Sequence, residues 1–160
     1  MWTGSRMVVW GGENPSKFDT GALYDPATDS WVGTTSTTGS PSARSHMKGV
    51  WTGREMIIWG GGSGGPHLNS GARYNPATDT WSGPTPTAGS PTGRASFAMV
   101  WTGSRMIVWG GDQDGTLVNT GGIYQPPIPA VGPHTSTISI SAPGANNSPQ
   151  TIAIDLTVNP

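Results

Sequence analysis

The segment Trp51-Thr-Gly-Arg-Glu-Met-Ile-Ile-Trp-Gly-Gly61 decides the fold, because nearly the same eleven residues occur three times in the chain. The other two copies begin at Trp2 and Trp101, which places the three starting tryptophans 49 and 50 positions apart. A fixed period near 50 residues is typical of proteins built from repeated units that pack against their neighbours. The repeat is therefore a better guide to domain organisation than the total length of 160 residues.

The composition favours short strands and turns over helices. The chain holds 25 glycines and 15 prolines, and both residue types interrupt regular structure. Eight tryptophans supply enough apolar surface for a core, so we do not interpret the low charged fraction of 11% as disorder in residues 1–124. The net charge is −1 and Lys and Arg do not cluster, which argues against nucleic acid as a partner.

Neither a membrane span nor a cysteine framework is expected. The sequence has no apolar run of about 18 residues, so we predict no membrane insertion, and it contains no cysteine. Residues 1–20 lack the pattern of a signal peptide. Met1 aligns with Val50 and Val100, inside the first expected strand of the repeat. We therefore hypothesise that the sequence is part of a longer chain.

Each repeat is expected to contain four antiparallel strands. In the second repeat the first two strands are residues 45–51 and 56–59, joined by a turn that contains Gly53. The run Met56-Ile-Ile-Trp59 is apolar on both faces, so we predict it to be the most buried strand. The third strand, residues 71–74, leads through Asn75-Pro-Ala-Thr-Asp79, which has the residues of a turn, to a fourth strand at Thr80-Trp81.

These features together resemble the kelch repeat: a Gly-Gly doublet after the second strand, a Tyr followed by Asp/Asn-Pro-x-Thr-Asp, and a Trp in the fourth strand. The resemblance covers residues 1 to about 125 and implies an all-β fold, a kelch-type β-propeller whose blades are four-stranded antiparallel sheets. Because propellers close with about four to eight blades, we predict an incomplete propeller: an open arc with apolar end faces, followed by a β-hairpin tail. The residues assigned structural roles in this pattern are Trp10, Gly11, Gly12, Tyr24, Trp31, Trp59, Gly60, Gly61, Tyr74, Trp81, Trp109, Gly110, Gly111 and Tyr124.

We divide the chain into five segments. Residues 1–40 form a first blade with a truncated first strand, 41–90 a complete second blade, and 91–125 a third blade whose fourth strand is missing or replaced. Residues 126–134 are predicted to be a proline-rich linker, because proline cannot donate a hydrogen bond within a sheet. Residues 135–160 are predicted to be a β-hairpin. This tail resembles the end of a BACON-like or immunoglobulin-like module; the alternative is that residues 135–141 supply the outer strand of the third blade.

The repeats differ most in the loops that follow the Gly-Gly doublets, residues 13–20, 62–70 and 112–120. We expect these loops and the connections between successive blades, residues 34–43 and 84–93, to project from one face. Function concentrates on loops that a rigid scaffold holds, so we predict a binding face there. The candidate residues on this face are Lys17, Arg44, His46, His67, Arg94, Asp112 and Asp114.

None of these candidates is assigned catalysis or metal binding. Asp112-Gln-Asp-Gly begins like a calcium loop but lacks the third acidic residue and the distal Glu, so a solvated turn is favoured. Arg44 and Arg94 begin the first strands and are expected either to bind an anion or to donate to loop carbonyls of adjacent blades. The repeated tryptophans are interpreted as packing between blades, in preference to stacking on a carbohydrate. No motif for a cofactor is found, and none is predicted.

The sequence therefore predicts a non-catalytic interaction module that binds a protein or a glycan through its variable loops. The remaining blades of the same ring, in a longer chain, are a second expected partner. The resemblance and the Thr/Gly/Ser-rich composition favour a secreted or surface-attached bacterial protein. Two alternatives stay open: a fragment of a kelch-type enzyme of the oxidase or sialic-acid epimerase class, whose active site lies mostly in other blades, and a structural spacer.

Overall fold

A computed structural model describes residues 1–127 and two further strands, residues 134–140 and 150–156. The chain divides into two compact units, residues 1–126 and 127–160, and each is considered by itself. All regular structure in the described residues is β-strand. Among those residues, no helix has the length and apolarity needed to cross a membrane.

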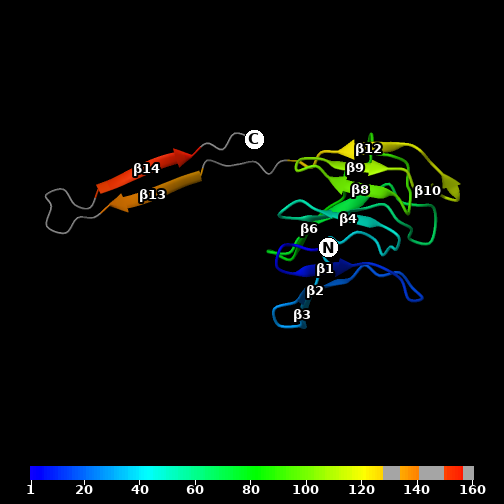
Figure 1. Cartoon of the computed structure of the whole chain (residues 1–160), viewed down its shortest axis with the longest axis horizontal. Helices are drawn as coiled ribbons and strands as arrows, with labels where there is room; N and C mark the ends of the chain where they lie inside the picture. The colour runs from blue at the N-terminus through cyan, green and yellow to red at the C-terminus, as the bar shows by residue number, and fades with distance from the viewer. Residues whose placement is uncertain (128–133, 141–149, 157–160) are drawn as a thin grey trace. The chain divides into compact units, whose positions relative to one another are not determined.

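The first unit consists of three antiparallel sheets that stack side by side as blades (Figure 1). Blade 1 contains β1 (Met7–Trp10), β2 (Gly21–Asp25) and β3 (Ser30–Thr34); blade 2 contains β4 (Lys48–Trp51), β5 (Met56–Trp59), β6 (Gly71–Asn75) and β7 (Thr80–Ser82); blade 3 contains β8 (Ala98–Trp101), β9 (Met106–Trp109) and β12 (Gly121–Tyr124). A short hairpin, β10 (Asp112–Gln113) with β11 (Thr116–Leu117), extends from blade 3. The all-β fold and the open arc of antiparallel blades are thereby confirmed.

Local sequence explains why each blade turns where it does. Between β4 and β5, the hydroxyl of Thr52 accepts hydrogen bonds from the amides that follow it, and Gly53 supplies a φ of +96°. Between β6 and β7, the Asn75 side chain accepts a bond of 3.0 Å from the amide of Ala77, and Asp79 takes a φ of +50°. These short turns fix the order β4-β5-β6-β7, with each strand hydrogen-bonded to the next.

The core lies between the blades and not within any one of them. Between blades 1 and 2, Val8 and Trp10 of β1 pack against β5, β6 and β7, with Trp81 at the outer edge. Between blades 2 and 3, Trp59 packs edge-on against Phe97, with ring centroids 5.3 Å apart. The same cluster contains Val50 and Ile57 of blade 2 and Met106 and Val108 of blade 3. All four residues of β5 are buried because this strand contributes to both clusters, which confirms the prediction for the Met56–Trp59 run.

The two end faces of the arc expose the residues that the inner interfaces bury. On blade 1, Val9 and Trp31 are exposed, and on blade 3 the same holds for Val100, Trp109 and Ile123. Blade 1 keeps a remnant of its first strand, since Met1 and Val8 exchange two main-chain hydrogen bonds of 2.7 and 2.8 Å. The predicted apolar end faces are therefore present.

In the second unit, β13 (His134–Ile140) and β14 (Gln150–Leu156) pair antiparallel in a two-stranded sheet. In the described ranges the hydrogen-bonded neighbour of β13 is β14, and β12 ends its sheet in the order β12-β9-β8. Residues 141–149 of the expected hairpin, and residues 128–133 of the expected linker, lie outside the described residues. The resemblance of the tail to a BACON-like or immunoglobulin-like module stays a prediction.

Candidate binding face

The three variable loops have different sequences but are closed at their bases in the same way. In blade 2, the amide of Gly60 donates to the Ser70 carbonyl at 3.1 Å, and the amide of Leu68 donates to the Gly61 carbonyl at 2.8 Å. The corresponding bonds in the other blades are Gly11 to Thr20 and Phe18 to Gly12, and Gly110 to Thr120 and Val118 to Gly111, all 2.9 to 3.0 Å long. Each loop is therefore held in the same frame, whatever residues it carries.

The loop bases of blades 1 and 2 are also fastened to the following blade. The amide of Gly61 donates to the Arg94 carbonyl at 2.9 Å, as Gly12 donates to Arg44 at 3.0 Å. A Cβ atom on Gly60 would lie only 2.6 Å from the Phe97 ring and 2.8 Å from the Arg94 carbonyl oxygen. The first glycine of the doublet thus allows the next blade to approach its backbone closely.

Arg44 and Arg94 lie beneath this face with almost fully buried side chains, 2% and 1% exposed. In Arg94 the guanidinium donates to the carbonyl oxygens of Thr92, Gly110 and Thr120 at 2.7 to 3.0 Å. Arg44 makes the equivalent bonds to Ser42, Gly60 and Ser70. Burial lowers the pKa of both arginines, and the carbonyl oxygens accept hydrogen bonds from their guanidinium N–H groups. The carbonyl groups that accept these bonds lie in the same blade as the arginine. The expectation that the arginines donate to carbonyls of adjacent blades was therefore wrong.

A first polar cluster joins the loop of blade 1 to blade 2. Lys17 lies 3.2 Å from the Glu13 carboxylate, and the hydroxyl of Ser45 donates to the same carboxylate at 3.0 Å. The Ser45 hydroxyl also lies 3.0 Å from Nδ1 of His46. The hydrogen bond from Ser45 and the contact with Lys17 hold the pKa of Glu13 below its ordinary value. The result is a charge-balanced cluster between two blades.

A second polar cluster joins the loops of blades 2 and 3. The His67 amide donates to the Asp114 carboxylate at 2.7 Å, and Nδ1 of His67 lies 3.0 Å from the amide nitrogen of Asp114. The same Nδ1 lies 3.1 Å from the Asp112 carbonyl oxygen; it accepts from the Asp114 amide when it carries no hydrogen and donates to the Asp112 carbonyl when it carries one. Asp114 and Gly115 both have positive φ, +50° and +89°, as the two central residues of a tight hairpin turn require.

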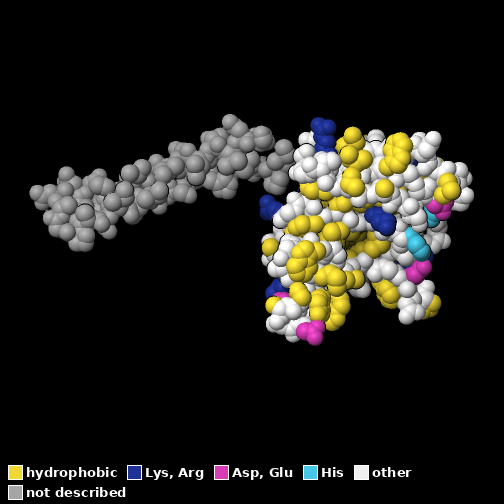
Figure 2. Space-filling model, viewed as in Figure 1, with side chains coloured by type: hydrophobic (Ala, Val, Ile, Leu, Met, Phe, Trp, Pro, Cys, Tyr) yellow, Lys and Arg dark blue, Asp and Glu magenta, His cyan; other side chains and the backbone are white. Residues whose placement is uncertain are grey.

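The equivalent position of the three loops carries three different kinds of side chain: Lys17, His67 and Leu117. Lys17 is paired with Glu13, and His67 is hydrogen-bonded to Asp114. Leu117, the last residue of β11, is 86% exposed. Figure 2 shows histidine and acidic side chains at the right-hand edge of the first unit, where the loops end in Figure 1. The scaffold is thus constant and the chemistry at this position varies from blade to blade.

The opposite face of the arc is hollowed but repetitive. A groove of about 700 Å³ lies between the turns of blades 1 and 2, lined among others by Arg6, Asp25, Trp51 and Arg54. Arg6 and Asp25 form an ion pair of 3.3 Å at its edge. On this face the Thr-Gly turn recurs in all three repeats, and the Pro-Ala-Thr-Asp turn is identical in the first two. Substitutions on this face therefore serve as controls for substitutions on the loop face.

The structure gathers the candidate residues into two clusters and not into a single site. His46 and Lys17 belong to the first cluster; His67, Asp112 and Asp114 belong to the second; the two arginines lie below them. Sequence reasoning missed Glu13, Ser45 and Leu117. Only Leu117 had a signal in the sequence, as one of two neighbouring apolar residues in a loop otherwise made of polar and glycine residues. Ligand binding by any of these residues stays a prediction, and within residues 1–127 no group of three or more His, Cys, Asp or Glu side chains is arranged to hold a metal ion.

Comparison with known proteins agrees with this architecture. Residues 1–126 match the family described as the KLHDC2/KLHL20/DRC7 Kelch-repeats domain. The match ends where the third blade ends and leaves out the second unit. No curated protein gave a significant match to the chain.

Proposed function

Because the chain belongs to the Kelch-repeat family, whose domains generally bind protein partners, we propose that it is a non-catalytic module that binds a protein through its loop face. The observation that carries this proposal is the variation at positions 17, 67 and 117 on loops with the same backbone closure. A scaffold that keeps the loop geometry and changes the side chain is suited to recognition.

The chemistry of this face combines an exposed apolar side chain with two polar clusters. Leu117 offers an exposed apolar side chain; on the other two loops Lys17 is paired with Glu13, and the His67 amide is hydrogen-bonded to Asp114. Binding energy at protein interfaces concentrates in a few central side chains surrounded by polar ones. The partner we propose therefore presents an apolar pocket to Leu117 and hydrogen-bonding groups to its neighbours. A bacterial cell-surface location and a glycan ligand stay predictions of the sequence.

A pair of variants on opposite faces tests the proposal. Leu117→Asp places a charge on the loop face, and Ala77→Asp places the same charge on the exposed turn between β6 and β7. Immobilised wild-type protein and both variants are incubated with extract or culture medium from the source organism, and retained proteins are compared by mass spectrometry. We expect a protein that wild type and Ala77→Asp retain and that Leu117→Asp loses, with affinity reduced at least about tenfold. Equal retention by both variants, or no retained protein, contradicts the proposal.

A further inference from the structure

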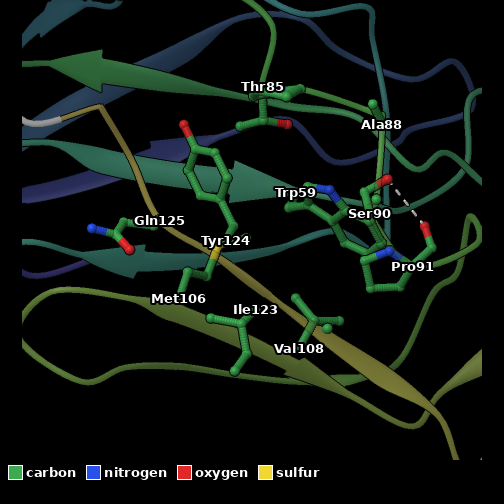
Figure 3. A pocket seen from close by; sticks show the side chains of 13 residues that line it. Trp59, Thr85, Ala88, Ser90, Pro91, Met106, Val108, Ile123, Tyr124 and Gln125 are labelled. Atoms are coloured by element: carbon green, nitrogen blue, oxygen red, sulfur yellow. Dashed lines mark hydrogen bonds between the residues drawn. The ribbon is translucent and has the colours of Figure 1, made fainter.

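A cavity of about 220 Å³ lies beside β12 of blade 3, and residues of the connection between blades 2 and 3 form part of its wall. Figure 3 shows Tyr124 and Trp59 on two sides of this gap, with Thr85 above it and Met106 below it. The remaining wall comes from the connection between blades 2 and 3, around Ala88 and Pro91. The cavity is therefore bounded by two neighbouring blades and a loop, and its walls are mostly apolar.

The equivalent space between blades 1 and 2 is filled by the indole of Trp81. That ring lies 5.3 Å from the Trp10 ring and 4.9 Å from the Tyr74 ring, and its Nε1 donates to the Ser36 carbonyl at 2.8 Å. Trp81 itself lies in β7, the outer strand of blade 2. The indole is thus held by two aromatic rings and one hydrogen bond.

Each group that holds Trp81 has a counterpart around the cavity. By repeat position, Trp10, Ser36 and Tyr74 correspond to three residues that line the cavity: Trp59, Pro86 and Tyr124. Met56 and Ile58, which share the cluster of Trp81, correspond to Met106 and Val108, which also line it. The repeat position of Trp81 itself is Val131, which lies outside the described residues. All eight tryptophans of the sequence lie at or before residue 109.

The strand next to the cavity is open to pairing. In blade 2, β6 pairs on its outer side with β7, with Tyr74 opposite Trp81. Its counterpart β12 ends its sheet in the described part of the chain, so one side of this strand is available to a further strand. Asp79, two residues before Trp81, also accepts a bond of 2.7 Å from the Tyr74 hydroxyl. The counterpart of Asp79 in the sequence is Pro129, so no carboxylate is supplied to Tyr124 from that position.

We propose that this cavity is a binding site for an extended segment of another protein that carries the pattern Asp-x-Trp. The segment adds antiparallel to β12 as the fourth strand of blade 3. Its indole enters the cavity between Trp59 and Tyr124 and donates to the Pro86 carbonyl, and its carboxylate accepts from the Tyr124 hydroxyl. Within residues 1–160 the two Asp-x-Trp sequences, at residues 29–31 and 79–81, already belong to β3 and β7 or lead into them, and we assign the bound segment to a second protein.

The probe for this site is the nine-residue peptide with the sequence of Asn75–Gly83, Asn-Pro-Ala-Thr-Asp-Thr-Trp-Ser-Gly, titrated into the full chain by isothermal calorimetry. We expect saturable binding at one site, and at least about a tenfold loss of affinity when the peptide tryptophan is replaced by alanine. When the Asp of the peptide is replaced by Asn, we expect weaker binding to the wild-type chain but unchanged binding to the Tyr124→Phe variant. The proposal is overturned if neither peptide binds, or if the tryptophan and alanine peptides bind equally.

Two variants of the chain localise the binding. Ala88→Glu places a charge in the cavity wall and is expected to abolish peptide binding, whereas Thr38→Glu, its repeat counterpart beside the filled space, leaves binding unchanged. In a second measurement that does not depend on these variants, residues 125–133 are replaced by the same nine-residue sequence. This graft raises the melting temperature by about 5 °C or more relative to the same graft with alanine at position 131. Equal melting temperatures for the two grafts, or unchanged binding by Ala88→Glu, contradict the proposed site.

Discussion

Blades 2 and 3 have closely similar sequences up to Tyr74 and Tyr124, yet among the three blades of residues 1–126 only blade 2 packs against another blade on each face. Trp59 is 2% exposed, while Trp109, at the equivalent position in blade 3, is 58% exposed. All four residues of β5 are buried, whereas β9 alternates between buried and more accessible residues. The same strand sequence therefore acquires its burial from the blade beside it. A repeat of this kind is one half of two interfaces and not a folding unit by itself.

The largest difference between the two blades is expected at these tryptophans. Trp59→Ala removes the ring that packs against Phe97 and leaves a cavity between blades, so we expect the free energy of unfolding to fall by about 4 kcal/mol. Trp109→Ala removes a ring that mostly contacts solvent, and a loss of less than about 1 kcal/mol is expected. Urea denaturation of the full chain measures both values. Equal losses would show that the blade 3 end face is covered in solution.

The buried arginines sharpen the comparison, because here the two blades are alike. Arg44 and Arg94 both donate to three carbonyl groups of their own blade, and both are buried. Replacement of either by Met leaves buried carbonyls without donors, so we expect each change to cost about 3 kcal/mol. The exposed Arg54 is the control, and Arg54→Met is expected to change the unfolding free energy by no more than about 0.5 kcal/mol.

A difference in destabilisation between the two arginine variants would contradict the view that each arginine acts through the carbonyls of its own blade. If Arg44→Met were far more destabilising than Arg94→Met, the stabilising role of the guanidinium would depend on the flanking blades and not on the carbonyls of its own blade. Arg→Lys at both positions gives an intermediate check. A single ammonium group cannot reach all three carbonyl oxygens in the fork geometry of a guanidinium, so part of the loss persists.

The first glycines of the doublets in blades 2 and 3 differ in whether a following blade packs against them. Gly60 and Gly110 have similar positive φ values, +73° and +66°, so replacement by alanine strains both backbones alike. A Cβ on Gly60 meets Phe97 and the Arg94 carbonyl below 3.0 Å, whereas a Cβ on Gly110 meets only the Val118 carbonyl oxygen, at 3.6 Å. We therefore expect Gly60→Ala to cost about 2 kcal/mol more than Gly110→Ala. Thermal unfolding of the pair shows whether the difference exists, and its absence would mean that blade 3 can withdraw from Gly60.

The architecture could be predicted from the sequence because it repeats. Three copies of one pattern reveal the strands, the turns and the Gly-Gly doublets, and the burial of Met56–Trp59 follows from a run that is apolar on both faces. The exposure of Trp31 and Trp109 also follows, since an incomplete ring must leave end faces uncovered. Repetition therefore supplies the fold and the interfaces together.

The details of the candidate site could not be predicted, because they depend on contacts between residues far apart in sequence. The Ser45 hydroxyl meets Glu13 across 32 positions, and His67 meets Asp114 across 47. The sequence placed no carboxylate near His67, yet the next blade supplies one. It also gave no reason to expect positive φ at His46 and at its counterpart Ser96, +56° and +53°, since neither residue is glycine. Pairing between loops is a property of the assembled arc.

The smallest expected effect concerns the tyrosines next to the filled and the empty indole positions. The Tyr74 hydroxyl donates to Asp79 at 2.7 Å beside Trp81, so Tyr74→Phe is expected to cost about 1 kcal/mol. Tyr124 has no equivalent aspartate in the sequence, and Tyr124→Phe is expected to leave the unfolding free energy nearly unchanged. Chemical denaturation at pH 7 compares the two. A larger loss for Tyr124→Phe would mean that its hydroxyl already has a buried acceptor.

The pH dependence of stability gives the same comparison a second observable. Burial, together with the hydrogen bond to Asp79, raises the pKa of Tyr74, so the folded state keeps this hydroxyl protonated at pH values where the unfolded chain, near pH 10, releases the proton. Its contribution to stability is therefore complete below about pH 10 and is lost as the pH rises above that value. Tyr74→Phe removes this group, so unfolding free energies between about pH 9 and pH 11 should fall less steeply in the variant than in the wild type. Burial also raises the pKa of Tyr124. The unfolding free energy of the Tyr74→Phe variant is therefore still expected to fall with rising pH, but less steeply than that of the wild type. Parallel slopes for Tyr74→Phe and the wild type would show that Tyr74 ionises as readily in the folded protein as in the unfolded chain.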